Sequence, residues 1–128
     1  MSDGLPRAYL RSGLLVLLAG GQAHGYDLLE QARGLGISVH DPGSLYRILR
    51  SMERDGEVRS WWEPSDAGPS RRTYVLTGAG QVALVEVASS LRTTISRLQR
   101  LAEAAEAQVP VTQRAVTQRA ATQDLASR

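Results

Sequence analysis

The stretch DPGSLYRILRSMERDGEV, residues 41–58, decides how this chain folds. Its apolar residues recur at spacings of three and four, which places them on one face of a helix. That face is formed by Leu45, Ile48, Leu49 and Met52. Asp41 and Ser44 are both suitable N-caps, and Gly56 suits the position just beyond the C-terminus. We therefore predict a helix that lays one apolar face on a core.

The other face of this helix carries groups that suit an anionic partner. Tyr46, Arg47 and Arg50 are expected to point largely outward. Ser44 is expected at the exposed N-terminal end, where free backbone N–H groups favour a phosphate oxygen. An arginine can reach a phosphate or a base edge, and a tyrosine hydroxyl can donate to a phosphate. The acidic residues would lie away from this surface, at the far end: Glu53, Asp55 and Glu57.

Two shorter helices are predicted upstream. Pro6 suits the first position of a helix over residues 6–19, which Gly20 and Gly21 end. A second helix over residues 26–33 ends at Gly34 and Gly36. Their apolar faces are formed by Leu10, Leu14, Leu17 and Leu18 in the first helix, and by Leu28, Leu29 and Ala32 in the second.

The pattern changes from helix to strand after residue 57. Residues 58–63 and 72–77 are rich in β-branched and aromatic side chains, and the turn-forming PSDAGPSR lies between them, which predicts a β-hairpin with a long polar tip. Three helices followed by a hairpin are the winged form of the helix-turn-helix, whose third helix enters the major groove of DNA. The predicted fold class is therefore mainly α with a small β-hairpin.

Two pairs of hairpin residues need separate interpretations. Alternation along a strand sends Arg71 and Arg72 to opposite faces, so one is expected to be structural, and we favour Arg71 for contact with the minor groove. The same alternation predicts that either Trp61 or Trp62 packs inward while its neighbour is exposed or lies on a dimer. Packing is the favoured role for both tryptophans, and effector binding is the alternative.

A long helix over residues 78–107 follows a cap and turn at Thr77 and Gly78. It carries a seam in steps of four and three. The seam is formed by Leu84, Ala88, Leu91, Ile95, Leu98, Ala102 and Ala105. The helix could fold back on its own core, but dimerisation is favoured because the three-helix unit is too small to cover so long a seam. The expected organisation is a DNA-binding domain over residues 1–77, a dimerisation helix over 78–107 and a tail over 108–128.

The tail and the overall composition exclude several classes of function. The unit Thr-Gln-Arg-Ala occurs at 112–115 and 117–120, which predicts a flexible low-complexity segment. The chain has no cysteine, and His24 and His40 lack metal-ligand spacing, so we expect no metal, no cofactor and no enzyme. The N-terminus lacks the pattern of a secretory signal, and the apolar run at 13–21 is too short to span a membrane. A cytoplasmic protein with a formal net charge of +2 is expected.

Together these segments resemble the PadR-type transcriptional regulators. The resemblance rests on HGYDLLEQ (24–31), GSLYRILRSMERDGEV (43–58), WWE (61–63) and GPSRRTYVLTGAG (68–80), and the single helix after the wing is similar to the short, second subfamily. It implies a homodimer, a palindromic operator in double-stranded DNA, and repression that a small molecule or a stress signal relieves. With the residues argued above, the predicted DNA-binding set is Arg7, Arg11, Tyr26, Gly43, Ser44, Tyr46, Arg47, Arg50, Ser70, Arg71 and Arg72.

The sequence departs from this family at the expected effector site. Some drug-sensing members of the short subfamily place a tryptophan on the last helix, where this chain reads VASSLRTT with Leu91 near that position. We therefore expect an aliphatic effector, a ligand bound elsewhere or no ligand. The candidate effector-binding residues are Leu14, Trp62, Ala88 and Leu91. Control by abundance or by a protein partner, and a winged helix that docks protein instead of DNA, are the alternatives.

Overall fold

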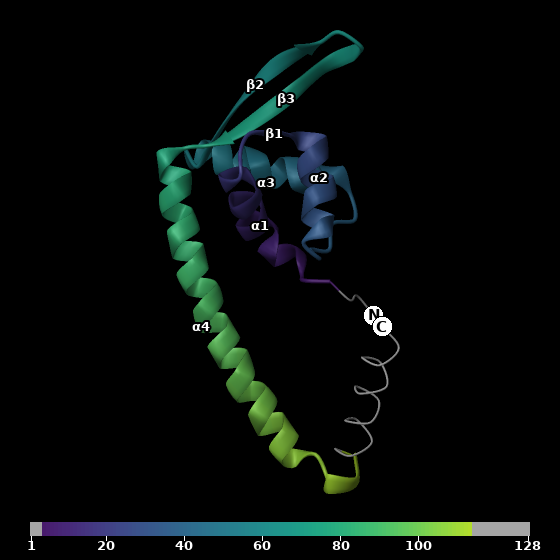
Figure 1. The fold of residues 1–128 in the computed structure, drawn as a ribbon, viewed down its shortest axis with the longest axis vertical. Coiled ribbons are helices and arrows are strands. Elements are labelled where there is room, and N and C mark those ends of the chain that lie inside the picture. The colour runs from purple at the N-terminus through teal and green to yellow at the C-terminus, as the bar shows by residue number, and fades with distance from the viewer. Residues whose placement is uncertain (1–3, 114–128) are drawn as a thin grey trace. The chain divides into compact units, whose positions relative to one another are not determined.

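The computed structural model describes residues 4–113, and its elements follow the predicted order (Figure 1). After a single 3₁₀ turn, the described residues form four α-helices and three strands. Their bounds are η1 (Arg7–Tyr9), α1 (Leu10–Ala19), β1 (Ala23–His24), α2 (Gly25–Gly34), α3 (Pro42–Arg54), β2 (Val58–Ser65), β3 (Gly68–Leu76) and α4 (Gly78–Gln108). The winged helix-turn-helix fold with a long C-terminal helix is confirmed.

The core lies between α1, α2 and α3, and the predicted apolar faces build most of it. The fully buried leucines are Leu10, Leu14 and Leu15 of α1, Leu28 of α2, and Leu45 and Leu49 of α3. Met52, Val58 and Tyr74 close the core beside them, while Ile48 is only partly buried. Each buried leucine side chain contributes about 1.5–3 kcal/mol relative to an exposed one, so this cluster is the main source of stability.

The ends of α3 follow from its sequence. Asp41 is the N-cap residue in extended backbone, and Pro42 occupies the first helical position, where its missing N–H costs nothing. Gly56 has a φ of +77°, a left-handed conformation that suits glycine just past a helix. Backbone bonds from Gly56 N to Glu53 O and from Glu57 N to Met52 O, at 3.0 and 2.9 Å, then close the helix end.

The β-sheet has three antiparallel strands in the order β1-β3-β2, one more than the sequence predicted. The additional strand is Ala23–His24, whose residues pair with Tyr74 and Thr73. The sequence predicted no strand here, because two residues leave no periodicity to detect. His24 Nδ1 lies 3.1 Å from the buried Thr73 hydroxyl.

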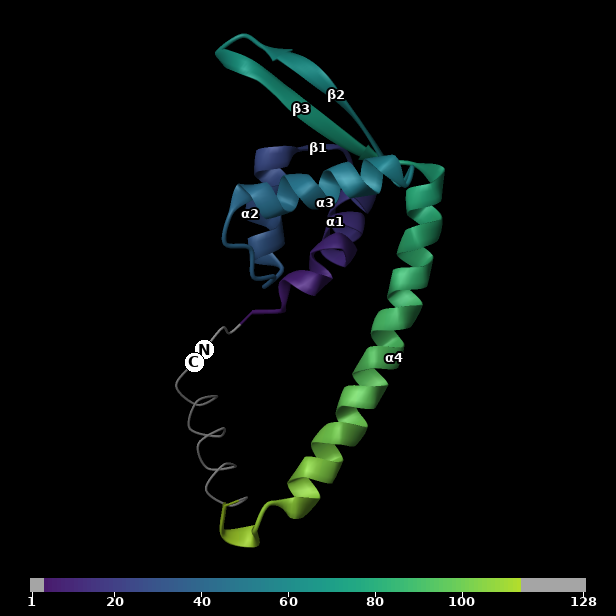
Figure 2. The same cartoon turned by 180° about the vertical axis from the view of Figure 1, so that it is seen from behind.

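The wing is longer and its tip shorter than predicted. The strands reach Ser65 and resume at Gly68, so that the turn consists of residues 66 and 67 (Figure 2). The prediction that one tryptophan packs inward was also wrong, since Trp61 and Trp62 are 37% and 62% exposed.

Helix α4 divides between two compact units, Met1–Ala88 and Ser89–Arg128, which are considered separately. In the first unit, Gly80 and Ala83 are buried, and Leu84 and Val87 pack against the core. In the second unit, no residue among 89–113 is buried, and Ile95, Leu98 and Leu101 are 44%, 56% and 66% exposed. Most of the Thr-Gln-Arg-Ala repeat falls outside the described residues.

Candidate nucleic-acid interface

The first turn of α3 gathers two of the predicted DNA-binding arginines around a buried serine. Ser44 is only 4% exposed, so the prediction that it lies exposed at the helix end was wrong. Its hydroxyl donates to Asp41 Oδ1 at 2.7 Å and accepts from the guanidinium groups of Arg7 and Arg47, at 3.1 and 3.4 Å. Ser44 thus holds the arginines in place instead of offering its own hydroxyl to a phosphate.

The same hydrogen bond affects the charge of Asp41. The Ser44 hydroxyl lowers the pKa of the Asp41 carboxyl below its ordinary value of 3.8, and the charges of Arg47 and Arg7 act in the same direction. Asp41 is therefore ionised at neutral pH, and it partly neutralises the two arginines. Gly43, also in the predicted set, is exposed in the same turn.

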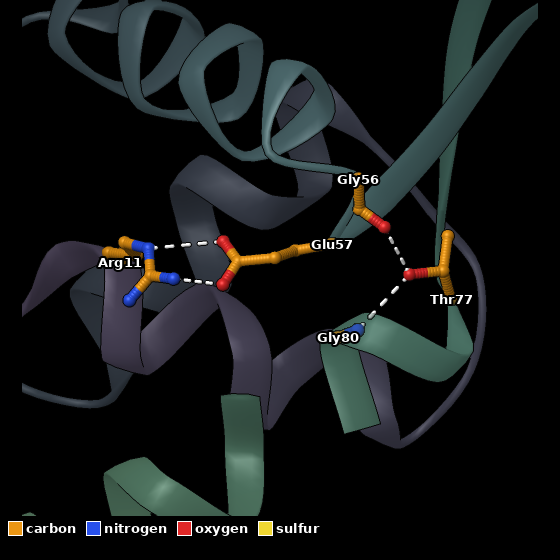
Figure 3. A network of polar contacts seen from close by, with 5 residues as sticks. All are labelled: Arg11, Gly56, Glu57, Thr77 and Gly80. Carbon is orange, nitrogen blue, oxygen red and sulfur yellow. Dashed lines mark hydrogen bonds and ion pairs between the residues drawn. The ribbon is translucent and has the colours of Figure 1, made fainter. Parts of the chain in front are cut away.

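Arg11, another predicted DNA contact, is engaged within the chain. Its Nε donates to Glu57 Oε1 at 3.1 Å, and its Nη2 bonds the other carboxylate oxygen (Figure 3). Glu57 is 6% exposed, whereas the sequence placed it only at the far end of the helix, away from the DNA-facing surface. A buried carboxylate requires a charged partner, so the pair explains Arg11 as a structural residue.

The two adjacent wing arginines differ in the way that strand alternation suggests. Arg72 donates to the Ser60 hydroxyl at 2.9 Å, lies 3.6 Å from Glu53 and stacks over Trp62 at 5.4 Å. These contacts tie the wing to the end of α3. Arg71, in contrast, is exposed. It pairs with Glu63 in the β-ladder, but its side chain has no hydrogen-bond or ion-pair partner among residues 4–113.

An open cleft of about 840 Å³ separates the wing from α2 and α3. It is lined by several of the predicted residues: Tyr26, Tyr46, Arg50, Ser70, Arg71 and Arg72. Arg7, Arg11, Gly43, Ser44 and Arg47 do not line it. Like Arg71, Arg50 is exposed and unpaired within the described residues. The cleft therefore presents two guanidinium groups that form no ion pair within the described residues, beside the acids Asp27 and Glu53, and a guanidinium can bind phosphate oxygens in bidentate geometry.

Tyr46 is positioned in this cleft by a glycine of the preceding helix. A Cβ at Gly25 would lie 2.7 Å from Tyr46 Cε1 and 3.0 Å from its hydroxyl. Only glycine lets the ring rest on the N-terminus of α2, and the ring is consequently half-buried instead of pointing freely outward. Sequence reasoning missed this contact, together with His24 and Asp27, which also line the cleft.

Of the candidate effector-binding residues, the cleft includes Trp62 alone. Leu14 is fully buried in the core of the first unit, so its role is packing. Ala88 is exposed on α4, and Leu91 is partly buried. Among the described residues there is no cluster of side chains that could hold a metal ion, and no helix that is long and apolar enough to cross a membrane.

The three helices, the wing and the unpaired arginines between them define a winged helix-turn-helix DNA-binding module. The chain belongs to the PadR-like family of transcriptional regulators, whose sequence profile matches residues 14–86. Members of this family are transcription regulators and not enzymes. No protein among the curated proteins matches the chain.

Solved structures share this fold. A conserved protein of unknown function, described as a potential transcriptional factor, is 30% identical, with a TM-score of 0.66 over 77% of this chain and 89% of its own. A PadR-like transcription factor from Bacteroides fragilis is 25% identical, with a TM-score of 0.62 over 74% and 91%. A PadR family transcription regulator from Clostridium difficile is 22% identical, with a TM-score of 0.65 over 73% and 97%.

Proposed function

We propose that this chain is a homodimeric repressor that binds a palindromic DNA operator through α3 and the wing. The observation that carries the proposal is a pair of exposed arginines, Arg50 and Arg71, whose side chains have no hydrogen-bond or ion-pair partner among residues 4–113 and which lie on either side of one cleft. In winged modules of this kind α3 enters the major groove and the wing reaches the adjacent minor groove. The backbone of one DNA strand then passes between them.

The proposed DNA-contacting residues divide into those that would bind phosphates and those that would read bases. Arg7 and Arg47 flank the first turn of α3, where they suit phosphates at the edge of the major groove. Arg50, one turn further along α3, is the candidate for a base edge, since its guanidinium forms no hydrogen bond or ion pair within the described part of the chain. Ser70 and Arg71 on β3 would contact the backbone or the minor groove. Phosphate contacts supply affinity, and base contacts supply specificity.

Homodimerisation through α4 completes the proposal. The seam residues Ile95 and Leu98, and Leu101 beside them, expose large apolar side chains that a second copy would bury. Leu84, the first residue of the predicted seam, packs partly against its own core, so its contribution to the dimer is expected to be smaller. A twofold-symmetric dimer matches a palindromic operator, because two α3 helices then read two inverted half-sites.

Relief of repression by a small molecule is the regulatory part of the proposal. A ligand that binds near Ala88 and Leu91 on α4 would act on the dimer, whereas a ligand stacked on Trp62 would act at the DNA cleft directly. Control by abundance or a protein partner requires neither site. Two exposed arginines that face one cleft suit the regularly spaced phosphates of a DNA backbone, which favours DNA as the partner of the cleft.

A fluorescence-anisotropy titration tests the DNA-binding function. The chain is titrated against a duplex from its own promoter region and against a scrambled duplex, at two salt concentrations. We expect tighter binding to the promoter duplex and a steep loss of affinity with salt, since cations are released from each phosphate that an arginine neutralises. Weak binding to both duplexes, without preference, would instead support the protein-docking alternative.

A further inference from the structure

The first turn of α4 is seated on the backbone that joins α3 to β2. Thr77 N donates to Glu57 O at 3.0 Å, and the Thr77 hydroxyl donates to Gly56 O at 2.5 Å (Figure 3). The same hydroxyl accepts from Gly80 N at 3.1 Å and so caps the new helix. One threonine therefore fixes the end of α3 and the start of α4 to each other.

Gly80 is needed at this seat for space. It has helical backbone and does not belong to the glycines with positive φ, so its conformation would accept any residue. A Cβ at Gly80, however, would lie less than 3.0 Å from Glu57 O and from two carbon atoms of the Leu76 side chain. Gly78, two residues earlier in the same helix, has nothing within 4 Å of the corresponding Cβ position. Close approach of α4 to the α3–β2 backbone thus depends on one glycine.

The backbone under this seat is itself anchored to the core. The buried carboxylate of Glu57 forms its two-point pair with Arg11 of α1, and Glu57 N donates to Met52 O at 2.9 Å. Residues from α1, α3, the wing and α4 meet at Glu57, all within the first compact unit. A movement of the first turn of α4 would therefore require a movement of the backbone at the end of α3.

We propose that Gly80, Thr77 and the Arg11–Glu57 pair are positioning residues that fix the direction in which α4 leaves the winged domain. In the dimer, this direction sets the separation of the two α3 helices, and so the half-site spacing that the protein accepts. The inference about half-site spacing rests on the proposed function. The inference about the direction of α4 concerns a single chain and is tested without DNA.

The absence of cysteine makes the direction of α4 measurable with spin labels. The double variant Glu30→Cys/Glu86→Cys carries one label at an exposed position of α2 and one at an exposed position of α4, both within the first compact unit, and dilution into unlabelled chain isolates the distance within one molecule. In this background we expect Gly80→Ala to shift or broaden the electron–electron distance distribution. Gly78→Ala should leave it unchanged, and it should keep or raise the melting temperature because alanine is the better helix former. An unchanged distribution in Gly80→Ala would overturn the proposal.

A second pair of variants keeps the proposal testable if Gly80→Ala does not fold. Thr77→Val removes the hydroxyl but keeps the shape, so we expect the distance distribution to broaden. Thr77→Ser keeps the hydroxyl and should restore the wild-type distribution. A general loss of stability would lower the fraction of folded chains but not change the distance within them, since only folded chains contribute a defined distance. The measurement therefore separates a change in the direction of α4 from a loss of stability. Equal distributions for wild type and Thr77→Val would count against the proposed junction.

The consequence for DNA is tested on promoter fragments whose footprinted half-sites are moved apart or together by single base pairs. We expect Gly80→Ala to lose about tenfold or more in affinity at the native spacing, because the two halves can no longer bind together. It should prefer a different spacing, whereas Gly78→Ala should behave as wild type. If the wild-type chain shows no promoter preference, the proposed function fails while the spin-label result still decides the junction. An unchanged spacing optimum in Gly80→Ala would refute its role in the dimer.

Discussion

Asp41 shows how one hydrogen bond links the start of α3 to pH. Because the Ser44 hydroxyl lowers the pKa of the folded carboxyl below 3.8, the folded state binds a proton less readily than the unfolded state. The resulting stability is fully present above pH 3.8 and is lost as the pH falls through the lowered value. We expect the difference in unfolding free energy between wild type and Asp41→Asn to shrink over that range, as measured by urea denaturation between pH 7 and pH 3.

Asp66→Asn is the control for this experiment, because Asp66 is exposed in the wing turn and does not belong to α3. Its stability relative to wild type should not follow the same pH dependence. If the difference between wild type and Asp41→Asn stayed constant down to pH 3, the Asp41–Ser44 bond would not contribute to the stability of the fold.

Arg71 and Arg72 are neighbours whose substitution should have different effects. Arg71→Ala removes an unpaired cation from the cleft, so we expect weaker DNA binding and a slope of log affinity against log salt that is smaller by about one, with the melting temperature unchanged. Arg72→Ala breaks contacts to Ser60, Glu53 and Trp62 and should destabilise the fold by roughly 1 kcal/mol. Anisotropy titration and thermal denaturation of both variants check this, and equal effects on stability would contradict the division of roles.

Helix α3 combines packing and recognition on opposite faces, and only its packing face should respond strongly to truncation. Leu49 is fully buried between α1 and α2, so Leu49→Ala leaves a cavity and should destabilise the fold by about 2–5 kcal/mol. Arg54→Ala, on the exposed face of the same helix, should change stability by less than about 0.5 kcal/mol. Chemical denaturation monitored by circular dichroism distinguishes the two, and a small effect at Leu49 would mean that the core collapses around the loss.

The elements with strong periodicity were predictable, whereas features that depend on distant partners were not. The spacing of Leu45, Leu49 and Met52 places them in the core without any knowledge of the fold. The burial of Glu57 depends on Arg11, which lies 46 residues away, and the strand at residues 23–24 exists only because β3 offers it partners. Likewise, Ser44 has an ordinary capping pattern, but Arg7 and Arg47 decide that its hydroxyl faces inward.

The candidate site was predicted to a similar degree. Helical spacing identifies the positions that face away from a core, so the exposure of Arg50 on α3 was predicted correctly. The spacing of residues along a helix or strand does not reveal whether an arginine forms an ion pair, because the carboxylates that pair with Arg11 and Arg72 lie elsewhere in the chain. The structure therefore reduces a set of arginines with similar sequence context to the few that remain unpaired.

The whole molecule should be active only as a dimer, since a single winged domain reads one half of a palindrome. Leu98 is 56% exposed on α4, and a second copy would cover it in the proposed seam. We expect Leu98→Glu to dissociate the dimer, because it would place a carboxylate in an apolar interface without a partner. Gln99→Glu, the adjacent exposed position, adds the same charge off the seam and should leave the dimer intact. Multi-angle light scattering gives the mass of each variant, and anisotropy should show promoter affinity falling in Leu98→Glu alone. A Leu98→Glu chain that remained dimeric would place the interface on another face of α4 or away from this helix.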